Sequence, residues 1–273
     1  NRGRCDGMAS TSLRLFKGLD SPEGLQLGAS TTHDLELSSA RRYIAMYYAK
    51  RATNPVQSYA DEISSKPPSE ILDHLNAVFA GRGADPVVMF FFQKTTGGYV
   101  GHTVTPYGVQ ALGGGIYRVK VYDNNNTEDA YRYLEINREA ETWSYDFSPT
   151  ERWSGNADTA TLGIVPISLY AEPPICPWCS SARAGRITAD AGNQADKGQV
   201  WMIGDGHLQI TDGDGNRLGY AGGAIVEEIP GASANFMPTG SVVAQEPIYT
   251  LPLTQTYTIR VLGSPAGAVR IQA

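Results

Sequence analysis

Two side chains in this 273-residue chain have the types and settings of a nucleophile and a base, Cys5 and His102. Cys5 lies in the segment Gly-Arg-Cys-Asp-Gly-Met-Ala, at or just before the first turn of a predicted helix. Unpaired backbone N–H groups at that point favour a thiolate and can hold an oxyanion. We expect the flanking glycines, Gly3 and Gly7, to let a substrate backbone come close. A small buried cysteine without chemistry is the alternative that this segment alone leaves open.

His102 stands on a predicted strand, in the segment Gly-Tyr-Val-Gly-His-Thr-Val, and shares one face with Val100 and Val104. A histidine on an apolar strand face is more often a core or edge residue than a catalytic one. Two features favour a general base here. Gly101 leaves space for a ligand beside the ring, and the hairpin that follows brings polar residues towards it.

The hairpin is predicted by a glycine triplet at residues 113–115, which is typical of a tight turn. A turn centred there places His102 opposite Asn125 or Asn126, at the end of an Asp-Asn-Asn-Asn run. A side-chain oxygen from this run can accept a hydrogen bond from the imidazole and fix its tautomer. A polar turn at a strand end is the alternative for the whole run.

Asp123 is the first candidate for that oxygen, because it shares a strand face with Val119 and Val121. Asn124 is the second candidate, since a shift of one residue in the strand register would exchange the two. The pattern of apolar residues leaves both open.

The elements that must position these residues follow an α+β order, with helices first and an antiparallel sheet after them. Apolar residues at helical spacing predict helices over residues 1–18, 38–51 and 69–81, the last capped by Ser69. Continuous or alternating apolar residues predict strands over residues 86–93, 99–111, 117–121, 131–137 and 142–147. Later short strands between turn-rich segments are typical of a small β-sandwich, over residues 200–203, 207–211, 224–229, 247–250 and 256–262.

We therefore predict a first domain over residues 1–172, a linker over 173–198 and an all-β domain over 199–273. The linker holds Cys176 and Cys179 in a Cys-Pro-Trp-Cys segment, which we interpret as a structural disulfide rather than a redox or zinc site. Cys5 is then an unpaired thiol, the pattern of a reactive cysteine in an exported protein.

The composition limits the partners and cofactors to expect. A net charge of −6 without a long Lys/Arg cluster argues against nucleic acid, and no apolar run approaches the roughly 18 residues that span a bilayer. Residues 212–216 begin like a calcium loop but lack its later ligands, so we predict a hairpin turn and expect no metal or other cofactor. The sequence starts without Met just before Cys5, which suggests loss of a leader or pro-segment and a secreted protein.

The order of a cysteine, a histidine on a strand and an Asp or Asn at the next strand end resembles the papain-like cysteine peptidase superfamily. The resemblance is to bacterial members in which a helix begins Cys-x-Gly-Met-Ala and a Gly-His-Thr/Ala-Val strand leads to Val-Tyr-Asp-Asn. The matching segments here are residues 5–9, 101–104 and 121–124, and the resemblance covers residues 1–170. It implies a helical half that carries the cysteine, a β half that carries the histidine, and a cleft between them.

The resemblance also implies roles. Cys5 would be the nucleophile, His102 the base and then the acid, and Asp123 or Asn124 the residue that orients the ring. Family members carry a Gln or similar oxyanion donor upstream of the cysteine, and Asn1 is the only upstream amide that could replace it here. The implied activity is hydrolysis of peptide bonds in a peptide or protein, with the β-sandwich as an adhesion, positioning or stabilising module. Acyl transfer on the same residues and a non-catalytic binding or toxin-like protein are the alternatives.

Overall fold

The computed structural model describes residues 4–31, 34–81, 85–96, 98–126, 129, 131–172, 197–203, 206–241, 245–263 and 270–272. Contacts between residues divide the chain into two units. Unit 1 comprises Asn1–Gln93, Val100–Pro174 and Pro238–Val242, and unit 2 comprises Lys94–Tyr99, Ile175–Met237 and Val243–Ala273. Helices precede a set of antiparallel sheets, which confirms the predicted α+β class.

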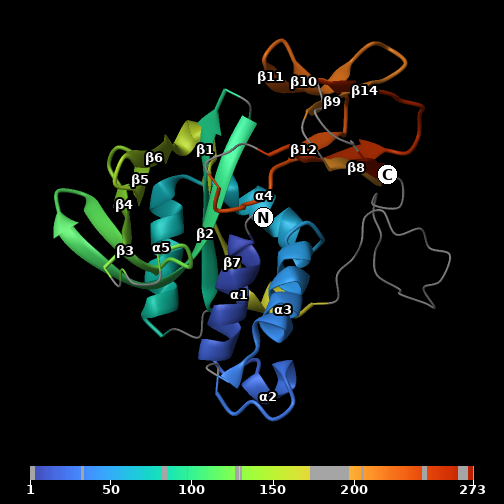
Figure 1. The fold of residues 1–273 in the computed structure, drawn as a ribbon. Helices are drawn as coiled ribbons and strands as arrows, with labels where there is room; N and C mark the ends of the chain where they lie inside the picture. The colour runs from blue at the N-terminus through green and yellow to red at the C-terminus, as the bar shows by residue number, and fades with distance from the viewer. Residues whose placement is uncertain are drawn as a thin grey trace. The chain divides into compact units, whose positions relative to one another are not determined.

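The described helices of unit 1 include five α-helices: α1 (Cys5–Phe16), α2 (Pro22–Leu25), α3 (Leu37–Lys50), α4 (Val56–Ser64) and α5 (Pro68–Phe79). α1 and α3 pack side by side (Figure 1). Gly7 permits their close approach, because a Cβ atom at this position would lie 2.0 Å from the carbonyl oxygen of Ile44. Gly7 therefore serves helix packing, and the expectation that it admits a substrate backbone is wrong.

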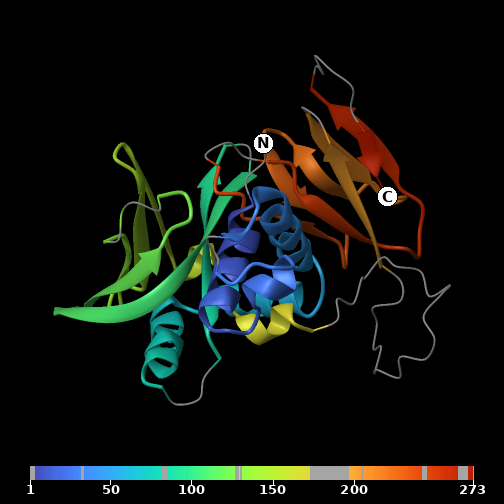
Figure 2. The same cartoon turned by 60° about the horizontal axis from the view of Figure 1, so that its bottom comes forward.

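One curled antiparallel sheet runs through unit 1 in the order β6-β5-β4-β3-β2-β1-β7. Its strands are β1 (Val87–Thr95), β2 (Gly98–Gly113), β3 (Ile116–Tyr122), β4 (Tyr133–Asn137), β5 (Thr142–Ser148), β6 (Glu151–Asn156) and β7 (Leu162–Pro166). Two short 3-10 helices, η2 (Ala157–Thr159) and η3 (Ile167–Tyr170), flank β7. Figures 1 and 2 show α5 on the other side of β2 from α1 and α3.

The apolar strand β1 supplies side chains to two parts of the core. Val88 and Phe90 pack with buried residues of α1, α3 and α4, among them Ala9, Leu13, Tyr47, Val56 and Ala60. Phe91 packs against aromatic rings of β5 and β6, with centroid distances of 5.6, 4.7 and 6.0 Å to Trp143, Tyr145 and Trp153. Burial on both faces explains why this strand is a continuous apolar run rather than an alternating one.

The start of α5 differs from the prediction. The helix begins at Pro68, and the Ser69 side chain does not cap it. The backbone N–H and the hydroxyl of Ser69 instead donate to the carboxylate of Glu141, at 2.9 and 2.5 Å. Glu141 precedes β5 and has a φ of 51°. Its negative charge lies at the positive end of the helix dipole, so it fixes α5 to the turn between β4 and β5.

Unit 2 contains two four-stranded antiparallel sheets, with the orders β11-β10-β9-β14 and β12-β13-β8-β15. The strands are β8 (Lys197–Ile203), β9 (His207–Thr211), β10 (Arg217–Ala221), β11 (Ala224–Glu227), β12 (Ser233–Asn235), β13 (Ile248–Pro252), β14 (Thr258–Leu262) and β15 (Arg270–Gln272). Both sheets contribute to one buried cluster, which contains Val200, Met202, Leu208, Ile210, Leu218, Ile229, Tyr249 and Leu251. Between β9 and β10, Asp212 accepts backbone hydrogen bonds from Asp214 and Asn216 and closes a tight turn.

The Glu246 side chain, which is only 3% exposed, joins three parts of unit 2. Its Oε1 accepts hydrogen bonds from the backbone N–H of Leu208 and the hydroxyl of Tyr249, both at 2.6 Å. Its Oε2 lies 2.9 Å from Nδ1 of His207, whose ring stacks on Tyr220 at 4.1 Å. Each oxygen of this buried carboxylate therefore has a partner, as its burial requires.

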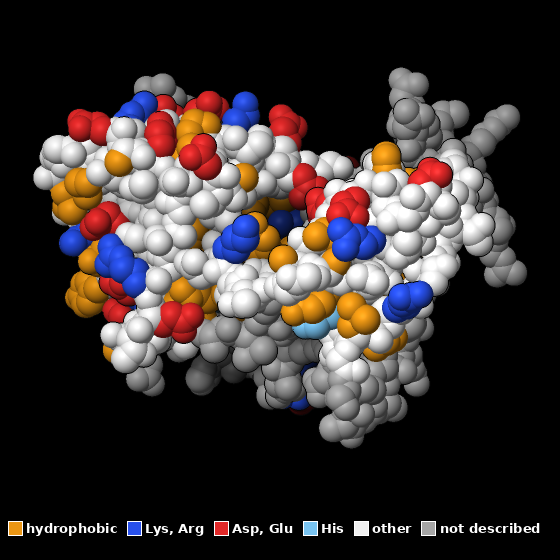
Figure 3. Space-filling model, turned by 90° about the horizontal axis from the view of Figure 1, so that it is seen from above, with side chains coloured by type: hydrophobic (Ala, Val, Ile, Leu, Met, Phe, Trp, Pro, Cys, Tyr) orange, Lys and Arg blue, Asp and Glu red, His pale blue; other side chains and the backbone are white. Residues whose placement is uncertain are grey.

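The described surface shows no concentration of one charge on the face in Figure 3, where Lys and Arg alternate with Asp and Glu. Among the described residues, no helix combines the length and the apolar character needed to cross a bilayer. The same residues hold no group of three His, Cys, Asp or Glu side chains placed to bind a metal ion.

Candidate active site around Cys5 and His102

Cys5 is the first residue of α1 and is only 1% exposed. The helix begins with a hydrogen bond of 2.9 Å from the backbone N–H of Met8 to the carbonyl oxygen of Arg4. Asn124, which follows β3, donates from Nδ2 to the carbonyl oxygen of Cys5 at 2.9 Å. These contacts hold the cysteine at the positive end of the helix, where a thiolate is favoured by the helix dipole.

His102 lies on β2 and is fully buried. Its ring meets Phe91 and Phe147 edge to face, with centroid distances of 5.8 and 5.6 Å. Its Nε2 lies 2.7 Å from Oδ1 of Asp123. Because an ionised carboxylate only accepts hydrogen bonds, Nε2 carries a proton, and in the neutral form of the ring Nδ1 carries the lone pair. Nδ1 is buried and has no hydrogen-bond partner among the residues that the structure describes.

Asp123 accepts three hydrogen bonds besides the one from His102. The hydroxyl of Tyr145 and Nδ2 of Asn126 donate to Oδ2, at 2.5 and 2.9 Å. The backbone N–H of Asn125 donates to Oδ1 at 2.8 Å. Burial opposes ionisation, but the hydrogen bond and charge of His102, together with Tyr145 and Asn125, outweigh it and hold the pKa of Asp123 well below its usual range.

The register of β2 and β3 explains why Asp123, and not Asn124, contacts the ring. Pro106 pairs with Val121, so these two side chains lie on one side of the sheet. By alternation His102 shares that side with Pro106, and Asp123 shares it with Val121. Asn124 is one residue further and turns to the start of α1 instead.

One small space borders both Nδ1 of His102 and Cys5. A Cβ atom on Gly240 would lie 3.0 Å from Nδ1 and 3.3 Å from Cβ of Cys5. Nδ1 has no hydrogen-bond partner, so the two side chains are neighbours without a hydrogen bond between them. Nδ1 is therefore the atom of His102 nearest to this space, which Cys5 also borders.

The surroundings of the Cys5 thiol disfavour its ionisation. Burial raises its pKa strongly and the Asp6 carboxylate raises it further, while hydrogen bonds with Thr103 lower it in part. Asp6 is itself buried, and it accepts hydrogen bonds from the hydroxyls of Tyr170 and Thr103 at 2.8 and 3.2 Å. Burial raises the pKa of Asp6 against the charge of Arg51. A desolvated thiol is a poor nucleophile, so the site as it stands is closed.

Sequence reasoning missed two residues of this site, Tyr145 and Gly240. Alternation along residues 142–147 places Tyr145 on the buried side of β5 together with Trp143, so its burial could have been predicted but its contact with Asp123 could not. Nothing near Gly240 in the sequence indicates that it lies beside the cysteine and the histidine.

Three residues of the predicted sites, Asn1, Cys176 and Cys179, lie outside the described residues. Most of the predicted linker, residues 173–196, lies outside them too. The oxyanion role of Asn1 and the disulfide remain predictions. Cys5 is a free cysteine.

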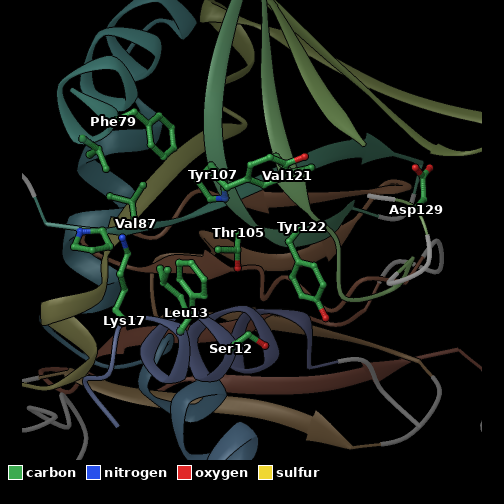
Figure 4. A pocket seen from close by; sticks show the side chains of 14 residues that line it. Ser12, Leu13, Lys17, Phe79, Val87, Thr105, Tyr107, Val121, Tyr122 and Asp129 are labelled. Atoms are coloured by element: carbon green, nitrogen blue, oxygen red, sulfur yellow. The ribbon is translucent and has the colours of Figure 1, made fainter. Parts of the chain in front are cut away.

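An apolar cavity of about 800 Å³ lies elsewhere in unit 1 (Figure 4). Leu13 of α1 and Lys17, the residue that follows this helix, line it together with Phe79 of α5 and Tyr122 of β3. Neither Cys5 nor His102 contributes to its lining. The cavity is therefore separate from the cysteine and the histidine.

No family model, no curated protein and no solved structure matches the chain. Its function is therefore inferred from the residues of the site and their geometry.

Proposed function

We propose that the protein is a cysteine hydrolase of the papain-like type that cleaves peptide bonds. The observation that carries this proposal is the hydrogen bond between Nε2 of His102 and Asp123. It leaves Nδ1 without a partner in the space that also borders Cys5. A base oriented by a carboxylate and placed beside a thiol is the arrangement that covalent catalysis by cysteine requires.

In the proposed reaction, Nδ1 of His102 takes the thiol proton and Sγ of Cys5 attacks the carbonyl carbon of a peptide bond. The tetrahedral intermediate collapses, the C–N bond breaks, and the leaving amine takes the proton from Nδ1. Water then gives a proton to Nδ1 and attacks the thioester. Release of the carboxylic acid returns the proton to Sγ. Asp123 keeps the ring oriented and stabilises the imidazolium in both halves of the cycle.

The start of α1 supports the step in which negative charge develops on the carbonyl oxygen. The first backbone N–H groups of a helix have no partner within that helix. Those of the turn that begins at Cys5 point towards the same end of α1 as the thiol, and they are suited to donate to an oxyanion. Asn124 fixes this turn through the carbonyl oxygen of Cys5 and acts as a positioning residue.

A non-catalytic protein with a degenerate site is the second candidate function, and the burial of the thiol, which raises its pKa, favours it. The two candidates differ in what His102 does to Cys5. In a hydrolase the reactivity of the thiol depends on the imidazole, whereas in a degenerate site it does not.

Hydrolysis of internally quenched peptides, followed over hours because the thiol is buried, tests the proposal. We expect cleavage that falls on the order of 10³-fold in either Cys5→Ser or His102→Ala. His74→Ala, a histidine substitution on α5 outside the site, is the matched control and should leave the rate unchanged. Equal cleavage by the native protein and His102→Ala would contradict the proposal.

A further inference from the structure

A short segment from the distant part of the chain, residues 238–240, lies at the site and is called the strap below. Its contacts assign it, together with residues 241 and 242, to unit 1, although the chain up to residue 237 and from residue 243 onwards belongs to unit 2. Pro238 and Thr239 are buried, with Thr239 only 3% exposed. The strap therefore belongs to the surroundings of Cys5 and His102 and not to an exposed loop.

Three hydrogen bonds among the described residues hold the strap, and each of them involves its main chain. The backbone N–H groups of Thr239 and Gly240 both donate to the carbonyl oxygen of Gly101, at 2.9 and 2.7 Å. The carbonyl oxygen of Gly240 accepts a hydrogen bond of 3.0 Å from Nδ2 of Asn125. The acceptor at Gly101 and the donor at Asn125 therefore recognise a peptide backbone rather than a particular charged side chain.

Glycine is required at two points of this contact. Gly240 has a φ of 64°, and a Cβ there would lie 2.9 Å from Asn125, 3.0 Å from His102 and 3.3 Å from Cys5. A Cβ on Gly101 would lie 3.1 Å from Cα of Pro238 and still closer to the ring of Phe92. The space beside the histidine that Gly101 was expected to leave for a ligand is thus filled by the chain's own residues.

We propose that the strap is a built-in occupant of the substrate position, and that this position takes neutral peptides with a glycine beside Cys5 and His102. The word "substrate" in this proposal rests on the proposed function. The presence of the strap beside Cys5 and His102 does not depend on that function. As part of the same chain, the strap competes with a free peptide at a high effective concentration, which keeps the site closed until the strap leaves. The burial of the Cys5 thiol is the state expected while the strap is in place.

Alkylation of Cys5 by iodoacetamide, read as a rate by mass spectrometry, tests the occupation. Gly240→Val introduces a side chain that the site cannot hold, and Gly215→Val is the matched control. Gly215 also has a positive φ, of 87°, but nothing lies within 4 Å of a Cβ placed there. We expect Gly240→Val to speed alkylation at least about tenfold, the order expected when one or two net hydrogen bonds are lost. Equal rates in the two variants would overturn the proposal.

A milder variant covers the case in which Gly240→Val does not fold, as judged by circular dichroism. Asn125→Ala removes the donor to the carbonyl oxygen of Gly240 and leaves the backbone N–H that binds Asp123. We expect a several-fold faster alkylation, consistent with the loss of about one hydrogen bond. An unchanged rate in Asn125→Ala, with no folded Gly240→Val to compare, would also overturn the proposal.

The glycine preference has its own probe, the amide-capped heptapeptide Phe-Met-Pro-Thr-Gly-Ser-Val of residues 236–242. We expect it to slow the alkylation of Cys5 in Gly240→Val, and the same peptide with Val in place of Gly to have no effect. Equal protection by both peptides would overturn the glycine preference. Fast alkylation of Gly240→Val without any peptide hydrolysis would support the occupation of the site by the strap and contradict the hydrolase function. The two proposals can therefore fail separately.

Discussion

Nδ2 of Asn124 donates to the carbonyl oxygen of Cys5 at 2.9 Å and joins the end of β3 to the first residue of α1. The same Nδ2 lies 3.5 Å from the carbonyl oxygen of Thr103. One amide thus links the element that carries the cysteine to the hairpin that carries the histidine. In the proposed hydrolase, such a link would fix the distance between the thiol and the imidazole that exchange a proton, and a small displacement there would be costly in rate.

Substitution of Asn124 should lower both stability and activity. Asn124→Ala leaves the buried carbonyl oxygen of Cys5 without its donor, and we expect a loss of about 1–3 kcal/mol in the free energy of unfolding. Asn124→Asp should cost more, because a carboxylate oxygen would then face a carbonyl oxygen. Urea denaturation of the three proteins measures the order. A more stable Asn124→Asp than Asn124→Ala would show that the amide is not the donor.

The Asp123 carboxylate should make the stability of unit 1 depend on pH. Its folded-state pKa lies below the unfolded value of about 3.9, so it contributes stability above that pH, and the contribution is lost as the pH falls through the folded pKa. Asp123→Asn removes this contribution. We expect the difference in unfolding free energy between native protein and variant to be largest near neutral pH and to shrink towards pH 3.

Tyr145→Phe is the companion to this variant, because it removes one donor to Asp123 and leaves the charge. The pKa of Asp123 should rise towards its unfolded value, so the pH-dependent part of the stability should shrink in the same direction but by less. Urea denaturation between pH 7 and pH 3 measures both variants. A pH dependence that is identical in native protein and Asp123→Asn would rule out the proposed ionisation.

Local sequence patterns could predict the features that depend on residues close together in the sequence. The helix at Cys5, the strand at His102 and the contact to Asp123 depend on helical spacing, on alternation and on one hairpin turn. Bulges at residues 107 and 112 interrupt that hairpin, but the register still brings Asp123 to the side of the ring. The bulges lie between the turn and His102, and they do not change the side of the sheet on which Asp123 lies. The predicted contact between Asp123 and His102 is therefore present.

The features that local pattern could not predict depend on residues far apart in the sequence. α4 buries Val56 and Ala60 in an otherwise polar stretch, and its apolar face is too short to stand out. The sequence indicates Ser69 as the cap of α5, because serine is a common capping residue. In the structure the cap is Glu141, which lies on a turn of the sheet far away in the sequence. Gly240 reaches the site only through the tertiary fold, so no window of sequence around it carries the signal.

The link between α5 and the sheet should be measurable through Glu141. Its carboxylate accepts both hydrogen bonds from Ser69, as a helix cap would. Glu141→Ala should therefore lower the free energy of unfolding by about 1 kcal/mol, the usual cost of losing a cap. Glu139→Ala, on the same turn, is the control, since no hydrogen bond from Glu139 to α5 is present. Thermal denaturation followed by circular dichroism measures both, and equal losses would contradict the capping role.

Glu246 should contribute to the stability of unit 2 as Glu141 does to that of unit 1, by accepting hydrogen bonds from two groups. Glu246→Leu leaves the backbone N–H of Leu208 and the hydroxyl of Tyr249 without their acceptor, and the latter is a core residue. We expect a loss of about 2–4 kcal/mol, since each buried group left without a partner costs about 1–3 kcal/mol. Glu228→Leu, whose carboxylate pairs with Arg217 at the surface, should cost much less. Protease susceptibility of residues 197–263 reports on this unit separately from Cys5 chemistry.

The fate of the acyl group separates peptide hydrolysis from acyl transfer, because both reactions pass through the same thioester on Cys5. In the proposed mechanism His102 activates whichever nucleophile enters, so water and an amine would compete for the intermediate. The open variant Gly240→Val, assayed with a glycine-containing peptide and rising glycinamide, should release mainly the carboxylic acid at low amine concentration. Product analysis by mass spectrometry measures the ratio of acid to amide. Predominance of the amide at low glycinamide would identify the protein as an acyltransferase, and would leave the roles of Cys5, His102 and Asp123 unchanged.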